Sequence, residues 1–180
     1  AGLYILGGAP VLNNTTFQGN RVTTGGAYNG GGGLYVMKSD PTLRDTTFME
    51  NEVMDSTAGT TYRGGGAVFL KCIPSNAKPA CNPTLINTTF LFNNGGDHGH
   101  KFSGGGAIYS VQSSFQVVNA DFYENEALGS SNGGAVYQWG EPYGSPQIVN
   151  ATFVANVAGG LGDGIYSYDT QGALTITNTI

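Results

Sequence analysis

The stretch "GGAVYQWGEPYGSPQIVNATFVAN", residues 133–156, contains a glycine pair, a short apolar run, a turn, a second apolar run and then Phe-x-x-Asn. The Phe-x-x-Asn part occurs five times, with phenylalanines at positions 17, 48, 90, 122 and 153. The spacings between them are 31, 42, 32 and 31 residues. The long spacing contains both cysteines, so we interpret residues 72–81 as an inserted loop. Repeats of this length are typical of solenoids.

Two further elements recur in every repeat. One is a glycine-rich start followed by an apolar run, as in "GGGLYV" at 31, "GGAVFL" at 65, "GGAIYS" at 105, "GGAVYQ" at 133 and "GDGIYS" at 162. The other precedes each phenylalanine, as in "TLRDTTF" and "QIVNATF". Short apolar segments rich in branched and aromatic residues, separated by turn residues, indicate β-strands.

These segments predict the fold. One repeat cannot bury its own apolar face, whereas stacked repeats can. We expect an all-β protein, a right-handed single-stranded parallel β-helix with five to six coils of about 31 residues and three strands per coil. Residues 1–180 are expected to form a single β-helix segment of a longer solenoid, because the chain begins and ends within a repeat.

Residues in equivalent positions are expected to form columns along the solenoid. The phenylalanines should make an interior aromatic stack (Phe17, Phe48, Phe90, Phe122 and Phe153). Asparagine columns should face inward at corners and form hydrogen-bonded ladders. The predicted ladder contains Asn14, Asp45, Asn87, Asn119, Asn150 and Asn178.

Four asparagines lie in Asn-x-Ser/Thr sequons. Asn14, Asn87 and Asn150 belong to the predicted ladder and should be inaccessible in the folded protein. Asn13 should point outward, which makes it the best glycosylation acceptor among them.

The paired motifs resemble the repeat of the polymorphic outer-membrane protein family. "GGAVF", "GGAIY" and "GGAVY" match its GGA-[ILV] part, and "FQGN", "FMEN", "FLFN", "FYEN" and "FVAN" match its Phe-x-x-Asn part. "GGGLY" and "GDGIY" depart from it at the alanine. The resemblance covers essentially the whole chain. It implies a β-helix like an autotransporter passenger, secreted or displayed at the outer membrane or cell surface, and often adhesive.

Composition narrows the classes of partner and location. The formal charge is −5 and no basic stripe is present, which disfavours nucleic-acid binding. No apolar run approaches the roughly 20 residues of a membrane span. Cys72 and Cys81 flank a short polar segment, and we expect a disulfide and therefore an extracellular or cell-surface location. The alternative is two free thiols in the cytosol.

Two clusters are candidate binding sites. Asp97, His98 and His100 in "GGDHGHKF" could offer three ligands to a metal, but an exposed glycine-rich loop is the favoured interpretation. Trp139 and Tyr143 lie at or near a turn and could stack on sugars or dock a partner. Packing over the edge of the coil is the favoured alternative for them. No cofactor is expected.

Hydrolysis of glycosidic bonds requires two carboxylates placed on either side of the bond. Glu50 with Glu52 and Glu124 with Glu126 occupy equivalent positions in "MENE" and "YENE" and are candidates for glycoside cleavage. We favour solvated charges beside a turn. Threonine pairs suggest ice binding, but their column is interrupted at Asp121.

The sequence therefore favours a non-enzymatic extracellular structural or adhesive module that stacks end to end in a filament or a longer passenger. Its expected partners are other protein chains, neighbouring β-helix segments, a host receptor or surface glycans. The alternative is a carbohydrate-active β-helix that cleaves or binds polysaccharides.

Overall fold

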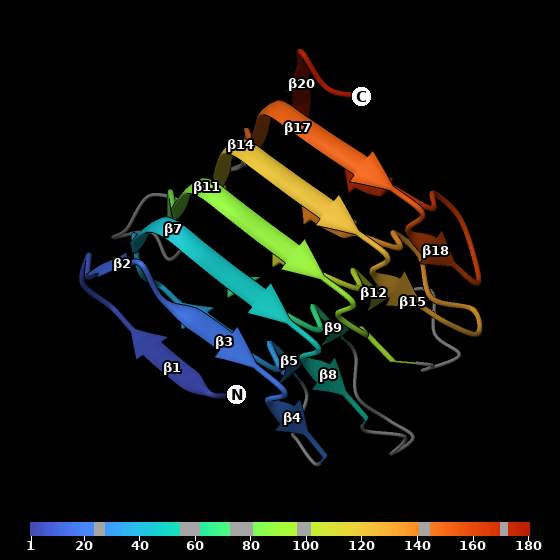
Figure 1. Cartoon of the computed structure of the whole chain (residues 1–180), viewed down its shortest axis with the longest axis horizontal. Helices are drawn as coiled ribbons and strands as arrows, with labels where there is room; N and C mark the ends of the chain where they lie inside the picture. The colour runs from blue at the N-terminus through green and yellow to red at the C-terminus, as the bar shows by residue number, and fades with distance from the viewer. Residues whose placement is uncertain (24–27, 55–61, 73–80, 97–101, 141–144, 170–172) are drawn as a thin grey trace.

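The computed structural model describes residues 1–23, 28–54, 62–72, 81–96, 102–140, 145–169 and 173–180. These residues form parallel strands and no helix, stacked in coils that follow the chain order (Figure 1). The predicted parallel β-helix is confirmed. Tyr143 and the histidine segment Asp97, His98 and His100 lie outside the described residues. None of the described residues belongs to a helix that is long and apolar enough to cross a membrane.

Sheet A contains the strand that follows each glycine pair. Its strands pair in parallel and in register, so that Val68, for example, lies between Leu34 and Ile108. In order they are β1 (Leu3–Leu6), β6 (Leu34–Met37), β10 (Val68–Lys71), β13 (Ile108–Val111), β16 (Val136–Gly140) and β19 (Ile165–Asp169).

Sheet B forms the long wall that faces the viewer in Figure 1. Its strands are β2 (Val11–Asn13), β3 (Thr16–Gln18), β7 (Thr42–Met49), β11 (Thr84–Leu91), β14 (Gln116–Tyr123), β17 (Gln147–Val154) and β20 (Thr175–Thr177). Two segments that the sequence presents as separate strands run here as one bent strand in β7, β11, β14 and β17.

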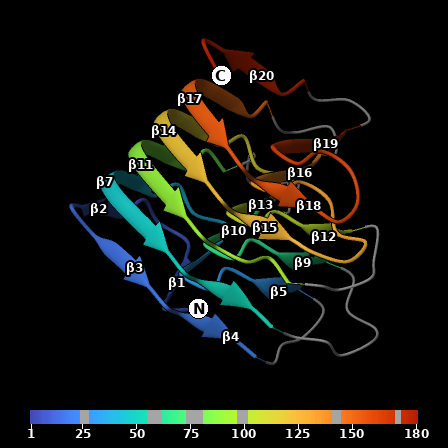
Figure 2. The ribbon, with the colours of Figure 1, turned by 45° about the vertical axis from the view of Figure 1, so that its right-hand side comes forward.

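Short strands complete the coils and were not expected as separate elements. They form three small sheets, seen beside sheets A and B in Figure 2. These are β4 (Arg21–Val22) with β8 (Glu52–Val53), β15 (Glu126–Ala127) with β18 (Val157–Ala158), and β5 (Tyr28–Gly30) with β9 (Tyr62–Gly64) and β12 (Ser103–Gly104). The first glycine of the pair turns the chain into sheet A with a positive φ, 64° at Gly65.

Between sheets A and B lies the main core. The five phenylalanines stack along it with centroid distances of 4.9, 5.2, 4.7 and 4.6 Å and rings within 6° of parallel. Aliphatic residues of both sheets, such as Leu34, Val68, Leu85 and Ile148, fill the remaining volume and are almost fully buried. Like residues therefore contact like residues along the axis, as the column alignment predicts.

The motif asparagines form a second ladder: Asn51, Asn93, Asn125 and Asn156 are buried, and Asn20 at its first position is half-buried. The backbone N–H and the side-chain Nδ2 of Asn93 both donate to Oδ1 of Asn125, at 3.1 and 2.9 Å. Its Nδ2 also donates to the carbonyl oxygen of Phe48 at 3.0 Å. The same set of bonds recurs at Asn51 and Asn125. The ladder thus satisfies polar groups at a corner that water cannot reach.

The other asparagine column is exposed, and the prediction that it faces inward and is inaccessible is wrong. Its six members (Asn14, Asp45, Asn87, Asn119, Asn150 and Asn178) are exposed and have φ between 48° and 54°. A left-handed residue breaks the in–out alternation of the strand, so that Arg44 and Asp45 both face outward. The column does form a ladder, with Nδ2 of Asn87 donating to Oδ1 of Asp45 at 3.0 Å.

This correction changes which sequons are accessible. Asn13 is exposed, as expected, but Asn14, Asn87 and Asn150 are exposed too.

Candidate functional site

The outer face of sheet A carries a second aromatic layer. Alternation along each strand directs one residue inward and the next outward. The outward column contains Tyr4, Tyr35, Phe69, Tyr109, Tyr137 and Tyr166. Phe69, Tyr109 and Tyr137 have no exposed area. Burial of aromatic rings on the outside of a solenoid wall requires a cover.

Strands β5, β9 and β12 and their flanking residues provide this cover. Tyr28 of β5 and Tyr62 of β9 pack against the buried aromatic layer, as does Trp139 of β16 in sheet A itself. The hydroxyl of Tyr109 donates to the carbonyl oxygen of Phe102 at 2.8 Å. Tyr137 is therefore buried on the outer face of sheet A and not in the main core.

An aromatic strip forms the surface of this second layer; we use the name for Tyr28, Tyr62, Phe102, Trp139 and Tyr168. The Tyr62 ring lies 5.1 Å from Tyr28 and 5.0 Å from Trp139, centroid to centroid. Phe102 lies 6.4 Å from both Trp139 and Tyr168. Four of the rings are half-buried, and Tyr168 is 45% exposed.

Lys71 lies at one end of this strip. It is 6% exposed, and its ammonium is 3.0 Å from the centroid of the Tyr28 ring, a cation–π contact. Burial lowers the pKa of Lys71, and the neighbouring charge of Lys38 lowers it further. The structure thus combines aromatic rings and a positive charge on one side of the rod.

Of the residues that the sequence suggested for binding, only Trp139 lies within the described ranges. Trp139 joins the aromatic strip, where it both packs over the coil and keeps part of its ring exposed. No group of three or more His, Cys, Asp or Glu side chains within the described ranges is arranged to hold a metal ion. The sequence interpretation missed Tyr28, Tyr62, Phe102, Tyr168 and Lys71.

The four candidate acids lie at a corner beyond sheet B. Glu52 forms an ion pair with Arg21 at 2.9 Å, and Oε1 of Glu126 accepts a hydrogen bond from Asn94 at 2.8 Å. Glu50 and Glu124 are exposed. Asn94 bridges Glu52 and Glu126, so these two acids are two coils apart, about 10 Å along the axis.

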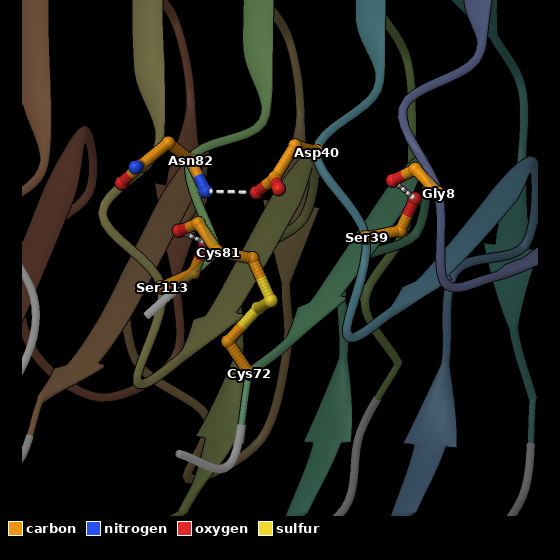
Figure 3. The surroundings of a disulfide bond; sticks show 7 residues. All are labelled: Gly8, Ser39, Asp40, Cys72, Cys81, Asn82 and Ser113. Atoms are coloured by element: carbon orange, nitrogen blue, oxygen red, sulfur yellow. Dashed lines mark hydrogen bonds between the residues drawn. A yellow bond between two sulfur atoms is a disulfide. The ribbon is translucent and has the colours of Figure 1, made fainter. Parts of the chain in front are cut away.

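The predicted disulfide joins Cys72 and Cys81, with 5.7 Å between their Cα atoms. Figure 3 shows it at the turn from sheet A to sheet B, where the Ser113 hydroxyl donates to the carbonyl oxygen of Cys81. In the same region the backbone N–H of Asn82 donates to Oδ1 of Asp40 in the coil below. The bridge therefore joins the end of β10 to the segment that leads into β11 within one coil.

Replacing both Cys72 and Cys81 by serine should lower the free energy of unfolding by about 2–3 kcal/mol, because the bridge closes a short loop in the unfolded chain. Urea unfolding of the oxidised wild type and the double variant measures the difference. Free-thiol titration of unreduced protein is the control. Two reactive thiols in the folded wild type would contradict the bridge.

Alkaline pH should destabilise the second aromatic layer. Burial raises the pKa of Tyr109 well above its usual value, and burial also raises the pKa of Tyr137. Above pH 10 the unfolded chain loses these phenol protons while the folded protein retains them, so the free energy of unfolding falls as pH rises. At pH 11 each such tyrosine costs about 1.4 kcal/mol.

Tyr109→Phe removes one of these ionisations. We expect the loss of unfolding free energy between pH 8 and pH 11 to be about 1.4 kcal/mol smaller in this variant than in the wild type. Urea unfolding at both pH values measures it. Tyr4→Phe, at a tyrosine that is 53% exposed, is the matched control. An identical pH dependence in wild type and Tyr109→Phe would contradict the assignment.

Comparison of the chain with protein-family models, curated proteins and solved structures gave no match.

Proposed function

We propose that this chain is a non-enzymatic structural or adhesive β-helix module of an extracellular or cell-surface protein. The aromatic strip is the observation that carries the proposal. It places partly exposed rings from several coils on one side of a rigid wall, and such rings are the side chains that dominate binding surfaces. The disulfide supports an oxidising location, since such bridges are rare in the cytosol.

The contacts of the acids favour binding over cleavage. Retaining glycosidases hold two carboxyl groups about 5–5.5 Å apart, and inverting ones about 6.5–9.5 Å apart, around a bound sugar. In the first candidate pair, Glu50 is exposed and Glu52 is engaged by Arg21. In the second pair, Glu124 is exposed and Glu126 is engaged by Asn94. Glu50 and Glu124 flank the exposed Phe92 in neighbouring coils. These contacts support surface charges and do not support a catalytic pair.

The buried asparagine ladder supports the proposed stacking of coils. Asn125 donates from its backbone N–H and Nδ2 to Oδ1 of Asn156. Asn156 presents the same two groups to the next position along the axis. A further coil with the Phe-x-x-Asn motif, in this chain or another, can therefore continue the ladder in a longer solenoid or fibre.

Adhesion assays test the proposal. Purified protein is applied to surfaces coated with matrix proteins and to insoluble polysaccharides, and release of reducing ends is measured in parallel. We expect retention without release, and loss of retention in the Trp139→Ala/Tyr168→Ala double variant. Tyr123→Ala, on the outer face of sheet B, is the matched control. Release of reducing ends that disappears in Glu52→Gln or Glu126→Gln would favour the carbohydrate-cleaving alternative.

A further inference from the structure

Lys71 is a buried cation, and it has no acidic partner among the residues that the structure describes. Within the described ranges, no carboxylate lies at ion-pair distance from its ammonium. Its contact is the Tyr28 ring, which gives only part of the stabilisation that water gives an ammonium group. An anion bound at this place would therefore stabilise the folded protein.

A second lysine lies beside it. Lys38 follows β6 directly, and its backbone N–H donates to the carbonyl oxygen of Lys71 in the next coil at 3.1 Å. The Lys38 side chain is exposed. Asp40, two residues after Lys38 in the sequence, is also exposed and accepts a hydrogen bond from the backbone of Asn82. Two lysines thus adjoin each other in a chain whose formal charge is −5.

The lysines and the aromatic strip form one continuous line. Register places Met37, Lys71, Val111, Trp139 and Tyr168 in a single outward column of sheet A. Tyr28, Tyr62 and Phe102 lie alongside it. From β6 to β19 this line crosses four coil spacings, about 19 Å. It is aligned with the rod axis, which suits an extended polymer.

We propose that this line binds an acidic polysaccharide lying along the rod, with its carboxylate or sulfate groups at Lys38 and Lys71 and its sugar rings on the aromatic strip. Such a chain alternates anionic groups with the apolar faces of pyranose rings. Nucleic-acid binding draws most of its affinity from many phosphate contacts to Lys and Arg, whereas only two lysines adjoin this line and the rest of it offers aromatic rings for sugar stacking. The inference deepens the proposed adhesive function and rests on it.

Isothermal titration with defined oligosaccharides tests the inference. The probes are a galacturonate hexamer, a sulfated heparin-derived hexamer, a neutral galactan hexamer and a thymidine oligonucleotide of similar length. We expect binding of at least one acidic hexamer, at least tenfold more tightly than the neutral one, and weakened by salt. The two acidic arms distinguish carboxylate from sulfate recognition.

Variants at exposed positions separate binding from folding. Lys38→Gln and Tyr168→Ala should each weaken binding of the acidic hexamer about tenfold, with unchanged thermal unfolding. Arg44→Gln and Tyr123→Ala, exposed on sheet B, are the matched controls and should bind as the wild type does. Equal losses in the controls would overturn the inference.

Three other results would also overturn it: no binding of either acidic hexamer, equal binding of the neutral hexamer, or equal or tighter binding of the oligonucleotide. The proposed function is judged separately. If acidic hexamers fail but Trp139→Ala/Tyr168→Ala still abolishes retention on surfaces, the adhesive proposal stands with a different ligand. If that variant leaves retention unchanged, both fail.

Discussion

Phe90→Ala should lower the free energy of unfolding by about 3–5 kcal/mol, a large part of the stability of a domain. Phe90 has no exposed area and stacks between Phe48 and Phe122, with centroid distances of 5.2 and 4.7 Å. The truncation removes both ring contacts and leaves a cavity at the middle of the core. Its neighbours are held by paired strands on either side, so the cavity cannot collapse easily. Urea unfolding followed by circular dichroism measures the loss.

Phe92→Ala is the matched control, two residues away in the same repeat. Phe92 is 44% exposed, and its ring meets Tyr123 edge to face at 5.8 Å. We expect a cost of about 1 kcal/mol or less. Similar costs at Phe90 and Phe92 would contradict the continuous interior stack.

Asn93→Ala should cost about 3 kcal/mol or more. The change removes the acceptor of the Asn51 backbone N–H and side-chain Nδ2, and the donor to the Phe48 carbonyl oxygen. Each buried polar group left without a partner costs about 1–3 kcal/mol. Alanine is too small to fill the position, and water has no route to it without separating the coils. Equilibrium unfolding again gives the magnitude.

Asn87→Gly provides the comparison within the exposed ladder. Asn87 has a φ of 52°, which glycine adopts without strain, and its hydrogen bond to Asp45 is solvent-exposed. We expect a change of about 0.5 kcal/mol or less. A larger loss at Asn87 than at Asn93 would show that the exposed column holds the coils together, contrary to the burial seen here.

The fold could be predicted from the sequence because its core is a set of columns. Phe48 contacts Phe90 of the next repeat, 42 residues later in the sequence, and the same residue type recurs at the same position of each repeat. The alignment of repeats is therefore also the alignment of contacts. The Cys72–Cys81 insertion was recognised for the same reason, since it lengthens one repeat without changing the columns on either side.

The side to which Asn87 and its equivalents point could not be read from spacing alone. Strict alternation from Leu85 places Asn87 inside, but the left-handed conformation at Asn87 shifts the alternation by one residue. The burial of Thr88 and the exposure of Asn87 follow from this shift. The motif asparagine Asn93 also forms a column in the sequence, but nothing in the sequence distinguishes the buried column of Asn93 from the exposed column of Asn87.

The sequence does contain a recurring pattern that marks three residues of the aromatic strip, although the alignment of the repeats did not use it. Tyr28, Tyr62 and Phe102 begin the sequences "YNGG", "YRGG" and "FSGG", directly before the glycine-led strands. They lie 11, 14 and 12 residues after the preceding phenylalanine of the repeat, and this unequal spacing hides their equivalence when repeats are aligned from the phenylalanine. The burial of Lys71 has no such signal, because it depends on Tyr28 from an earlier part of the chain.

The direction of the hydrogen bonds in sheets A and B has a mechanical consequence. Interstrand bonds run close to the rod axis, because the strands lie across it. Tension applied along the rod separates the hydrogen-bonded strand pairs one after another. A sideways force on one strand must break all of its interstrand hydrogen bonds together. A solenoid with this geometry should yield in steps of one coil under axial stretch and resist transverse shear far more strongly, a pattern that single-molecule force spectroscopy resolves.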